Sequence, residues 1–203
     1  MFVFVGDSIT EWPGGYVDVL AGRLGASSVV NAGVAGNRLE HLQQRLSVTG
    51  ASVLTISAGV NDTLVAFFEG PPTPPDVFES RYADLLRRSS GVPRVVVVEP
   101  FFLAVPSTDA PWRDGLAYAR ADLDAKRPIV RRLASRFGAT FVPLQDRFDE
   151  AARLHGAAAV APDGVHPSPL GHRLTADAWL DAFVAVVATV APRSRRSRRT
   201  SRP

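Results

Sequence analysis

Two distant segments of the chain hold residue types that together can hydrolyse an ester. A serine hydroxyl is a weak nucleophile near neutral pH and needs a positioned base to take its proton. Of the four histidines, only His166 has a carboxylate at a spacing that suits a short turn, in Asp163-Gly-Val-His166. Asp163 would accept a hydrogen bond from the ring Nδ1–H and leave Nε2 free to face a serine. Ser8, in Gly6-Asp-Ser8, is the candidate nucleophile.

Acyl transfer also creates an oxyanion, which preorganised hydrogen-bond donors must stabilise. The sequence offers three candidates, which are the backbone N–H groups of Ser8 and Gly36 and the side-chain amide of Asn61. Glycine suits the second position because a backbone donor without a Cβ can approach a substrate closely. Asparagine suits the third position because a neutral amide donates without losing a proton.

The apolar pattern predicts five strands, each followed by a helix. Runs such as Val95–Val98 do not alternate between polar and apolar residues, which is typical of strands buried on both faces of a parallel sheet. The predicted strands are Phe2–Val5, Ser28–Val30, Val53–Ser57, Arg94–Val98 and Thr140–Val142. The predicted helices are Tyr16–Leu24, Leu39–Leu46, Val77–Arg88, Arg120–Phe137, Gln145–Leu154 and Pro169–Val190. This alternation predicts an α/β fold, a three-layer α/β/α sandwich with a five-stranded parallel sheet.

Such sheets bind ligands beyond the carboxyl ends of their strands. Ser8 follows the first predicted strand, Gly36 the second and Asn61 the third. The three residues are therefore expected at one edge of the sheet, although they are far apart in sequence. Asp7 and Asp62 are expected to brace their turns through hydrogen bonds to the local backbone.

Four blocks of the sequence, in this order, resemble the SGNH/GDSL hydrolase superfamily of serine esterases. They are Gly6-Asp-Ser-Ile-Thr10, Asn31-Ala-Gly-Val-Ala-Gly-Asn37, Gly59-Val-Asn-Asp62 and Asp163-Gly-Val-His-Pro167. The resemblance implies the flavodoxin-like SGNH-hydrolase fold and a carboxylic ester hydrolase. It further implies Ser8 as nucleophile, His166 as a base oriented by Asp163, and an oxyanion hole made by Ser8, Gly36 and Asn61.

Within the superfamily, the chain is similar to small intracellular acetylxylan esterases, which deacetylate xylo-oligosaccharides. Glu99-Pro-Phe-Phe102 and the segment from 163 to 172 add to this similarity, whereas residues 11–15 are compact where that group often carries an insertion. Trp12 and Phe101 are candidate substrate-binding residues, and packing in the core is the open alternative for both. A thioesterase or lysophospholipase is the alternative with the same chemistry.

Positive charge is concentrated at the C-terminus. Six arginines lie in the last eleven residues, and without them the formal charge falls from +3 to −3. We expect a hydrolase domain at residues 1–191 and a disordered Arg-rich tail at residues 192–203, because the tail has nothing to bury. A non-enzymatic module that binds polyanions through this tail is an alternative of a different class. No specific nucleic-acid partner is predicted.

The composition also bears on disulfides, metal sites, membrane spans and location. It has no cysteine and no cluster of metal-ligand residues at typical spacing, so no disulfide, metal or cofactor is predicted. No run of 18 apolar residues predicts a membrane span. Residues 1–5 lack a basic signal-peptide region and lead directly into Gly6, which favours a cytoplasmic location. The expected partner is a small ester such as an acetylated sugar, and the oligomeric state is not indicated.

Overall fold

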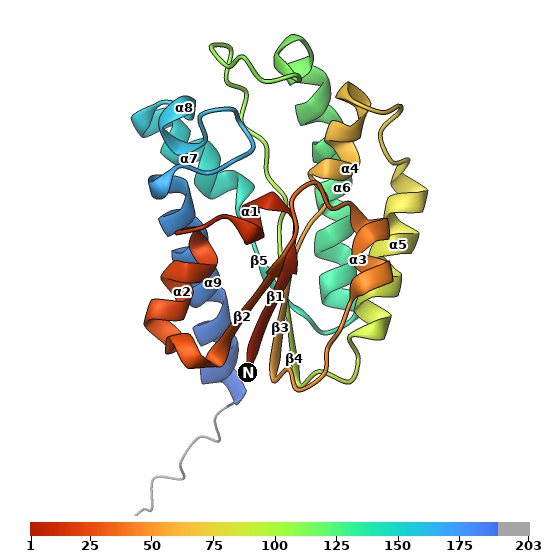
Figure 1. The fold of residues 1–203 in the computed structure, drawn as a ribbon, viewed down its shortest axis with the longest axis vertical. Helices are drawn as coiled ribbons and strands as arrows, with labels where there is room; N and C mark the ends of the chain where they lie inside the picture. Colours follow the sequence, from red (N-terminus) through yellow and green to blue (C-terminus); the bar gives the residue numbers. More distant parts are fainter. Residues whose placement is uncertain (191–203) are drawn as a thin grey trace, which may run out of the picture.

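A five-stranded, all-parallel sheet forms the centre of the computed structural model, which describes residues 1–190 (Figure 1). The strands are β1 (Phe2–Gly6), β2 (Val29–Gly33), β3 (Val53–Ser57), β4 (Arg94–Val98) and β5 (Thr140–Val142), in the order β2-β1-β3-β4-β5. The predicted five-stranded sandwich is therefore confirmed. The first two strands extend to glycines that the prediction left out, because Gly6 pairs with both Gly33 and Ser57 in the ladder.

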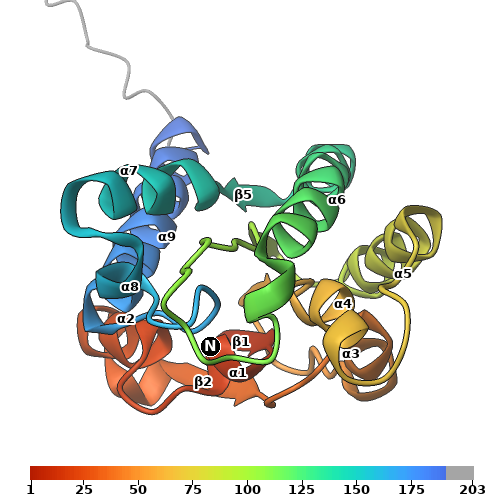
Figure 2. The ribbon, with the colours of Figure 1, turned by 90° about the horizontal axis from the view of Figure 1, so that it is seen from above.

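Helices cover both faces of this sheet (Figure 2). On one face lie α2 (Tyr16–Leu24), α7 (Gln145–His155) and α9 (Pro169–Val190), and on the other lie α3 (Leu39–Arg45), α5 (Pro75–Arg88) and α6 (Leu116–Arg136). Side chains alternate between the two faces along each strand, so Phe4 packs with Trp179 on one side while Val5 packs on the other.

Burial along the strands depends on their place in the sheet. All five residues of β3 are buried, as expected for a central strand between two helical layers. The edge strand β2 differs, and its Val30 is 41% exposed. The expectation of burial on both faces therefore applies to the centre of the sheet and not to this edge.

Several short elements have no counterpart in the predicted pattern. They are α1 (Ser8–Glu11), α4 (Asn61–Leu64), α8 (Ala157–Val160), and the 3₁₀ turns η1 (Ala26–Ser28), η2 (Val65–Phe67) and η3 (Arg113–Gly115). Three or four residues are too few to show a helical period in sequence. Two of these elements matter for function, because α1 begins at Ser8 and α4 begins at Asn61.

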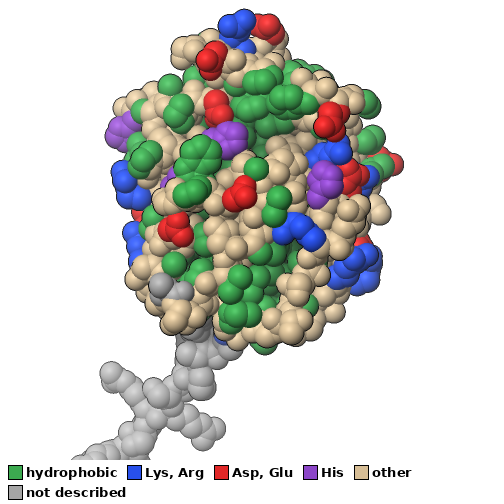
Figure 3. Space-filling view, in the orientation of Figure 1, with side chains coloured by type: hydrophobic (Ala, Val, Ile, Leu, Met, Phe, Trp, Pro, Cys, Tyr) green, Lys and Arg blue, Asp and Glu red, His purple; other side chains and the backbone are tan. Residues whose placement is uncertain are grey.

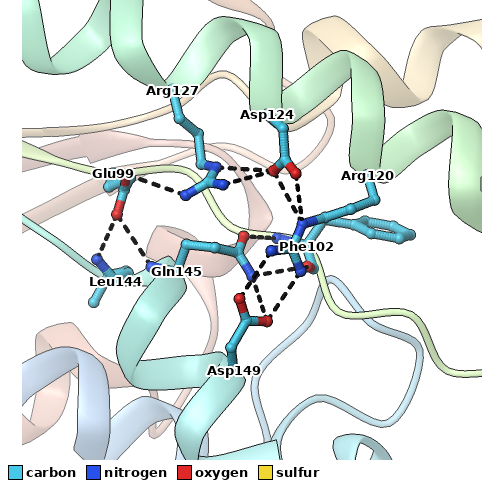
Figure 4. A network of polar contacts seen from close by, with 8 residues as sticks. All are labelled: Glu99, Phe102, Arg120, Asp124, Arg127, Leu144, Gln145 and Asp149. Carbon is cyan, nitrogen blue, oxygen red and sulfur yellow. Dashed lines mark hydrogen bonds and ion pairs between the residues drawn. The ribbon is translucent and has the colours of Figure 1, made fainter.

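A polar network fixes the chain after β4 to the helices α6 and α7 (Figure 4). Gln145 exchanges two hydrogen bonds with the backbone of Phe102, at 3.0 and 3.1 Å. Arg120 binds Asp149 with both terminal nitrogens, at 3.0 and 2.8 Å, and the buried Glu99 carboxylate accepts from the backbone at the start of α7. Paired bonds of this kind hold a segment in one orientation as well as one place.

The surface in Figure 3 carries acidic and basic side chains interspersed with hydrophobic ones on the visible face. Within residues 1–190, no helix is long and apolar enough to cross a membrane. The predicted Arg-rich tail, residues 192–203, lies outside the described residues.

Candidate active site

Ser8 lies at the first turn of α1, directly beyond the carboxyl end of β1. Asp7 caps this helix, and its Oδ1 accepts a hydrogen bond from the N–H of Ile9 at 3.0 Å. Position 6 requires glycine because neighbouring atoms lie close to its Cα. A Cβ there would overlap both the Thr10 side chain and the carbonyl oxygen of Ser57. The turn therefore presents the Ser8 hydroxyl and its backbone N–H at the edge of the sheet.

A continuous chain of hydrogen bonds joins Ser8, His166 and Asp163. Ser8 Oγ lies 2.9 Å from His166 Nε2, and His166 Nδ1 lies 2.6 Å from Asp163 Oδ2. The other carboxylate oxygen of Asp163 accepts the backbone N–H groups of Val165 and His166, at 2.9 and 2.7 Å. Asp163 thus orients both the imidazole ring and the turn that carries it.

The electrostatics of this pair favour a charged aspartate. The hydrogen bond that His166 Nδ1–H donates to Asp163 raises the pKa of His166 above its ordinary value, against the effect of burial. Burial alone would raise the pKa of Asp163, but the hydrogen bonds from His166 and Val165 outweigh burial and lower that pKa. The arrangement can therefore accept a proton at Nε2 and stabilise the resulting imidazolium.

The turn around His166 is held by the segment that follows β4. Trp112 Nε1 donates to the carbonyl oxygen of Asp163 at 2.7 Å, and the N–H of Leu103 donates to the carbonyl oxygen of Gly164 at 2.9 Å. Gly164 has φ +88°, and a Cβ there would overlap the carbonyl oxygen of Leu103. Nothing in the sequence pattern links residues 103 and 112 to this turn.

Gly36 and Asn61 lie on the other side of the site and together line a cavity of about 190 Å³. Gly36 has φ +74°, a conformation that favours glycine, and a Cβ there would meet no protein atom. Asn61 begins α4, and its side-chain Nδ2 donates to the carbonyl oxygen of Asn37 at 3.1 Å. The predicted donors therefore approach the site from β2 and β3, as the parallel topology requires.

Asp62 and Arg45 connect the loops that carry these donors. Asp62 Oδ2 accepts from the N–H of Leu39 at 3.0 Å and Oδ1 accepts from Thr73 Oγ1 at 2.9 Å, so this aspartate joins its loop to two distant segments and not, as expected, to the local backbone. Arg45 donates to the carbonyl oxygens of Gly6 and Ala32, each at 2.8 Å, so it joins the ends of β1 and β2. No sequence pattern indicates this role of Arg45, because its partners lie up to 39 residues away.

Comparison with known proteins identifies the family to which the chain belongs. Residues 4–174 match the GDSL-like lipase/acylhydrolase family, and this span includes Ser8, Gly36, Asn61, Asp163 and His166. The chain belongs to this family. It is a carboxylic ester hydrolase, as the sequence predicted.

Relatives of this GDSL hydrolase include an acetylxylan esterase. The chain is 27% identical to an acetylxylan esterase of Geobacillus stearothermophilus, over 88% of this chain and 91% of that protein. The crystal structure of that bacterium's acetylxylan esterase Axe2 superposes with a TM-score of 0.75 at 25% identity, covering 89% of this chain and 92% of Axe2. LAE5, an alpha/beta hydrolase from the metagenome of Lake Arreo, gives a TM-score of 0.77 at 25% identity over 91% of this chain and 95% of its own. Two further Axe2 structures are catalytic mutants, one of a serine and one of a histidine.

Asp7 is a buried carboxyl group directly before the GDSL serine. Its side chain is 1% exposed, and burial raises its pKa from the ordinary 3.8 to about 7. The nearby His166 and the N–H of Ile9 lower the pKa by smaller amounts. Asp7 contacts the backbone of α1, which agrees with the bracing role expected from sequence.

The two aromatic candidates differ in where this GDSL hydrolase places them. The Trp12 ring is 43% exposed and lies 5.5 Å from the His166 ring, centroid to centroid. Trp12 and His166 line a second cavity of about 400 Å³, together with prolines of the segment from 162 to 169. Phe101 is instead buried and packs against Phe148 in the core, with ring centroids 4.0 Å apart and ring planes tilted by 36°. The structure therefore brings Trp12 to the site and leaves Phe101 away from both cavities.

His172 is a structural neighbour of these residues. Its Nδ1 accepts the backbone N–H of Tyr16 at 3.1 Å, and burial lowers its pKa to about 4, so the ring is neutral near pH 7. Among residues 1–190, no group of three or more His, Cys, Asp or Glu side chains could hold a metal ion.

Proposed function

We propose that the chain hydrolyses short-chain carboxylic esters through an acyl-enzyme formed on Ser8. The observation that carries this proposal is the hydrogen-bonded chain from Ser8 Oγ through His166 to Asp163, with distances of 2.9 and 2.6 Å. These distances match those of a nucleophile, a base and the group that orients the base. The serine and histidine catalytic mutants of Axe2 support the same assignment.

The proposed reaction has two balanced halves. As Ser8 Oγ attacks the carbonyl carbon, its proton passes to His166 Nε2 and the carbonyl oxygen becomes an oxyanion. When the tetrahedral intermediate collapses, the bond to the alkoxy oxygen breaks and His166 gives its proton to the departing alcohol. A water molecule then repeats the attack on the acyl-enzyme, with His166 again as base, and releases a carboxylic acid and free Ser8.

The proposed oxyanion hole consists of the backbone N–H groups of Ser8 and Gly36 and the Asn61 amide. These groups extend from three adjacent strands, β1, β2 and β3, which fixes them before a substrate arrives. The Asn61 amide has two N–H groups, and one of them donates to Asn37. That bond orients the amide and leaves the second N–H for the substrate.

The cavity on the Gly36 side favours a short acyl group. It measures about 190 Å³, and charged residues line it beside the apolar Leu64, Val65 and Phe68. Arg38 and Glu69 both line it and lie 4.0 Å apart, nitrogen to oxygen. A long acyl chain would have to displace or desolvate these charges, which is costly, whereas an acetyl group would not reach them.

The cavity on the His166 side favours a larger alcohol. Because His166 protonates the departing oxygen, the alcohol leaves toward this side, where about 400 Å³ is open beside Trp12. A half-exposed tryptophan ring is a suitable surface for the apolar face of a sugar. The acetylxylan esterase relative supports an acetylated carbohydrate such as a xylo-oligosaccharide as the substrate.

Two measurements test this proposal. Ser8→Ala should abolish hydrolysis of 4-nitrophenyl acetate, while Ser90→Ala, a change at an exposed serine, should not. In a series of 4-nitrophenyl esters, kcat/KM should fall from acetate to octanoate, and acetylated xylo-oligosaccharides should release acetate. Full activity of Ser8→Ala would remove the mechanism. A preference for octanoate would remove the short-acyl assignment and favour a thioesterase or lysophospholipase.

A further inference from the structure

The chain has 22 arginines and a single lysine, and that lysine is fully buried beside the Asn61 turn. Lys126 lies on α6 with 0% of its side chain exposed. A buried ammonium group costs several kcal/mol unless its donors are all satisfied. The burial of the chain's one lysine at this site therefore calls for a chemical explanation.

All three donors of the Lys126 ammonium group have acceptors. Nζ lies 3.1 Å from the carbonyl oxygen of Asp62, 3.2 Å from Thr63 Oγ1 and 2.5 Å from Asp122 Oδ2. Thr63 Oγ1 in turn donates to Asp122 Oδ2 at 2.6 Å. Two of the three acceptors belong to the residues that directly follow Asn61.

The Asn61–Thr63 turn, which Lys126 contacts, needs contacts with other parts of the chain to keep its conformation. The helix α4 has only four residues, which is too short to be stable through its own hydrogen bonds. Its anchors are therefore external, with the Asp62 carboxylate bound to Leu39 and Thr73 on one side and Lys126 on the other. The Leu39 contact ties this turn to the loop that contains Gly36.

An arginine would not replace this lysine. The three acceptors converge on a single nitrogen atom, which suits a compact ammonium group, whereas a guanidinium group is planar and spreads its five donors in a fork. The space is closed by the Phe78 ring, whose centroid lies 5.6 Å from Nζ. This geometry explains why position 126 has a lysine, whereas every other basic side chain of the Lys/Arg type in this chain is an arginine.

We propose that Lys126 is a positioning residue for the oxyanion hole, because its ammonium group holds the Asn61–Thr63 turn against α6 and keeps the Asn61 amide beside the Gly36 loop. The inference rests on the proposed role of Asn61 in ester hydrolysis. Lys126 touches no substrate and acts only through the turn.

A double-mutant cycle tests this coupling in the full chain with 4-nitrophenyl acetate as substrate. Lys126→Met keeps the length of the side chain and removes the charge, and it should lower kcat by about 10- to 100-fold with KM changed less than about 3-fold. Lys126→Arg should lower kcat as well, because charge alone does not restore the three contacts. In an Asn61→Ala background, Lys126→Met should change kcat by less than about 3-fold, since the donor that it positions is gone.

The outcomes separate this inference from the proposed function. If Asn61→Ala leaves kcat unchanged, the oxyanion role of Asn61 fails and the proposed function must be revised. If Asn61→Ala lowers kcat but Lys126→Met costs the same factor in both backgrounds, only the positioning role of Lys126 is overturned. Lys126→Met combined with Asp122→Asn removes both charges of this ion pair and serves as the folded variant if the single change unfolds the chain.

A spectroscopic test needs no change at Lys126. Because the chain has one lysine, labelling lysine with ¹⁵N at Nζ gives a single side-chain NMR signal. Ser8 Oγ should attack the phosphorus of diethyl 4-nitrophenyl phosphate and release 4-nitrophenolate, which leaves a diethylphosphoryl group on Ser8 with its phosphoryl oxygen in the oxyanion hole. The Nζ signal should shift on adduct formation, and the shift should be much smaller in Asn61→Ala. An Nζ signal that does not move in the unmutated chain overturns the proposal.

Discussion

Replacing Asp7 with asparagine should stabilise the fold above pH 7 and much less at pH 4.5. In the unfolded chain this carboxyl loses its proton near its ordinary pKa of 3.8, whereas burial holds the pKa in the folded chain at about 7. Between these values the folded state binds more protons, so the stability of the unmutated chain falls as pH rises and levels off above pH 7. The free-energy equivalent of moving the pKa from 3.8 to about 7 is roughly 4 kcal/mol. Asparagine has the same size, keeps an acceptor for the N–H of Ile9 and does not ionise.

The assay is urea-induced unfolding of both proteins at pH 4.5 and pH 8. The free energy of unfolding of Asp7→Asn, relative to the unmutated chain, should rise between these pH values by about 3 kcal/mol, because about 1 kcal/mol of the full effect is already present at pH 4.5. Only this change with pH tests the pKa of Asp7. A difference in unfolding free energy that is the same at both pH values reports how well the amide packs. Asp109→Asn, at an exposed carboxylate, is the matched control and should show no such rise. A difference for Asp7→Asn that is equal at the two pH values would refute the reasoning.

Three further predictions concern the turn around His166. Because the Asp163 hydrogen bond raises the pKa of His166, and the proposed base must be unprotonated, kcat/KM should be lost as pH falls through a midpoint above 6.5. In Asp163→Asn that midpoint should move to lower pH and the maximal kcat should fall by about 10³- to 10⁴-fold, and an unmoved midpoint contradicts the assignment. Gly164→Ala should lower the free energy of unfolding by about 3 kcal/mol, because positive φ and overlap with Leu103 add. Gly138→Ala, with φ +67° and open space around the Cβ, should cost about 1 kcal/mol, and equal costs for the two would show that the overlap is relieved. Trp112→Phe removes the donor to the Asp163 carbonyl and should cost about 2 kcal/mol in thermal or urea unfolding, whereas no loss would mean that water replaces the indole.

The sequence predicted the sheet and the longer helices well because their patterns extend over many residues. The central strands form apolar runs, and β3, β4 and β5 have the predicted bounds. The parallel topology then made the positions of Ser8, Gly36 and Asn61 predictable, because residues after adjacent parallel strands must meet at one edge. Asp163 and His166 were predictable for another reason, since three residues on a turn determine whether a carboxylate can reach an imidazole.

The supports of the site were not predictable in this way. Arg45, Trp112 and Lys126 contact partners 39, 51 and 64 residues away, and such contacts exist only once the fold is complete. The helix α1 was also missed, because four residues carry no period. The composition did hold one signal, a single lysine among many arginines, but only the structure shows what that lysine binds. The sequence was compatible with Phe101 in a pocket or in the core, and its packing on Phe148 of the neighbouring helix α7 decides for the core.

The anchoring of the His166 turn has a consequence for protein engineering. Ser8, Gly36 and Asn61 are attached to the sheet, whereas His166 is attached through Trp112 and Leu103 to the connection that follows β4. We therefore expect changes of length or sequence within residues 104–111 to move Trp112, and with it the turn that carries His166, while the three strand ends stay in place. A library of variants in that connection would change the shape of the alcohol-side cavity beside His166 while Ser8 stays in place. Such a library is a suitable starting point for changing the substrate range of this enzyme by directed evolution.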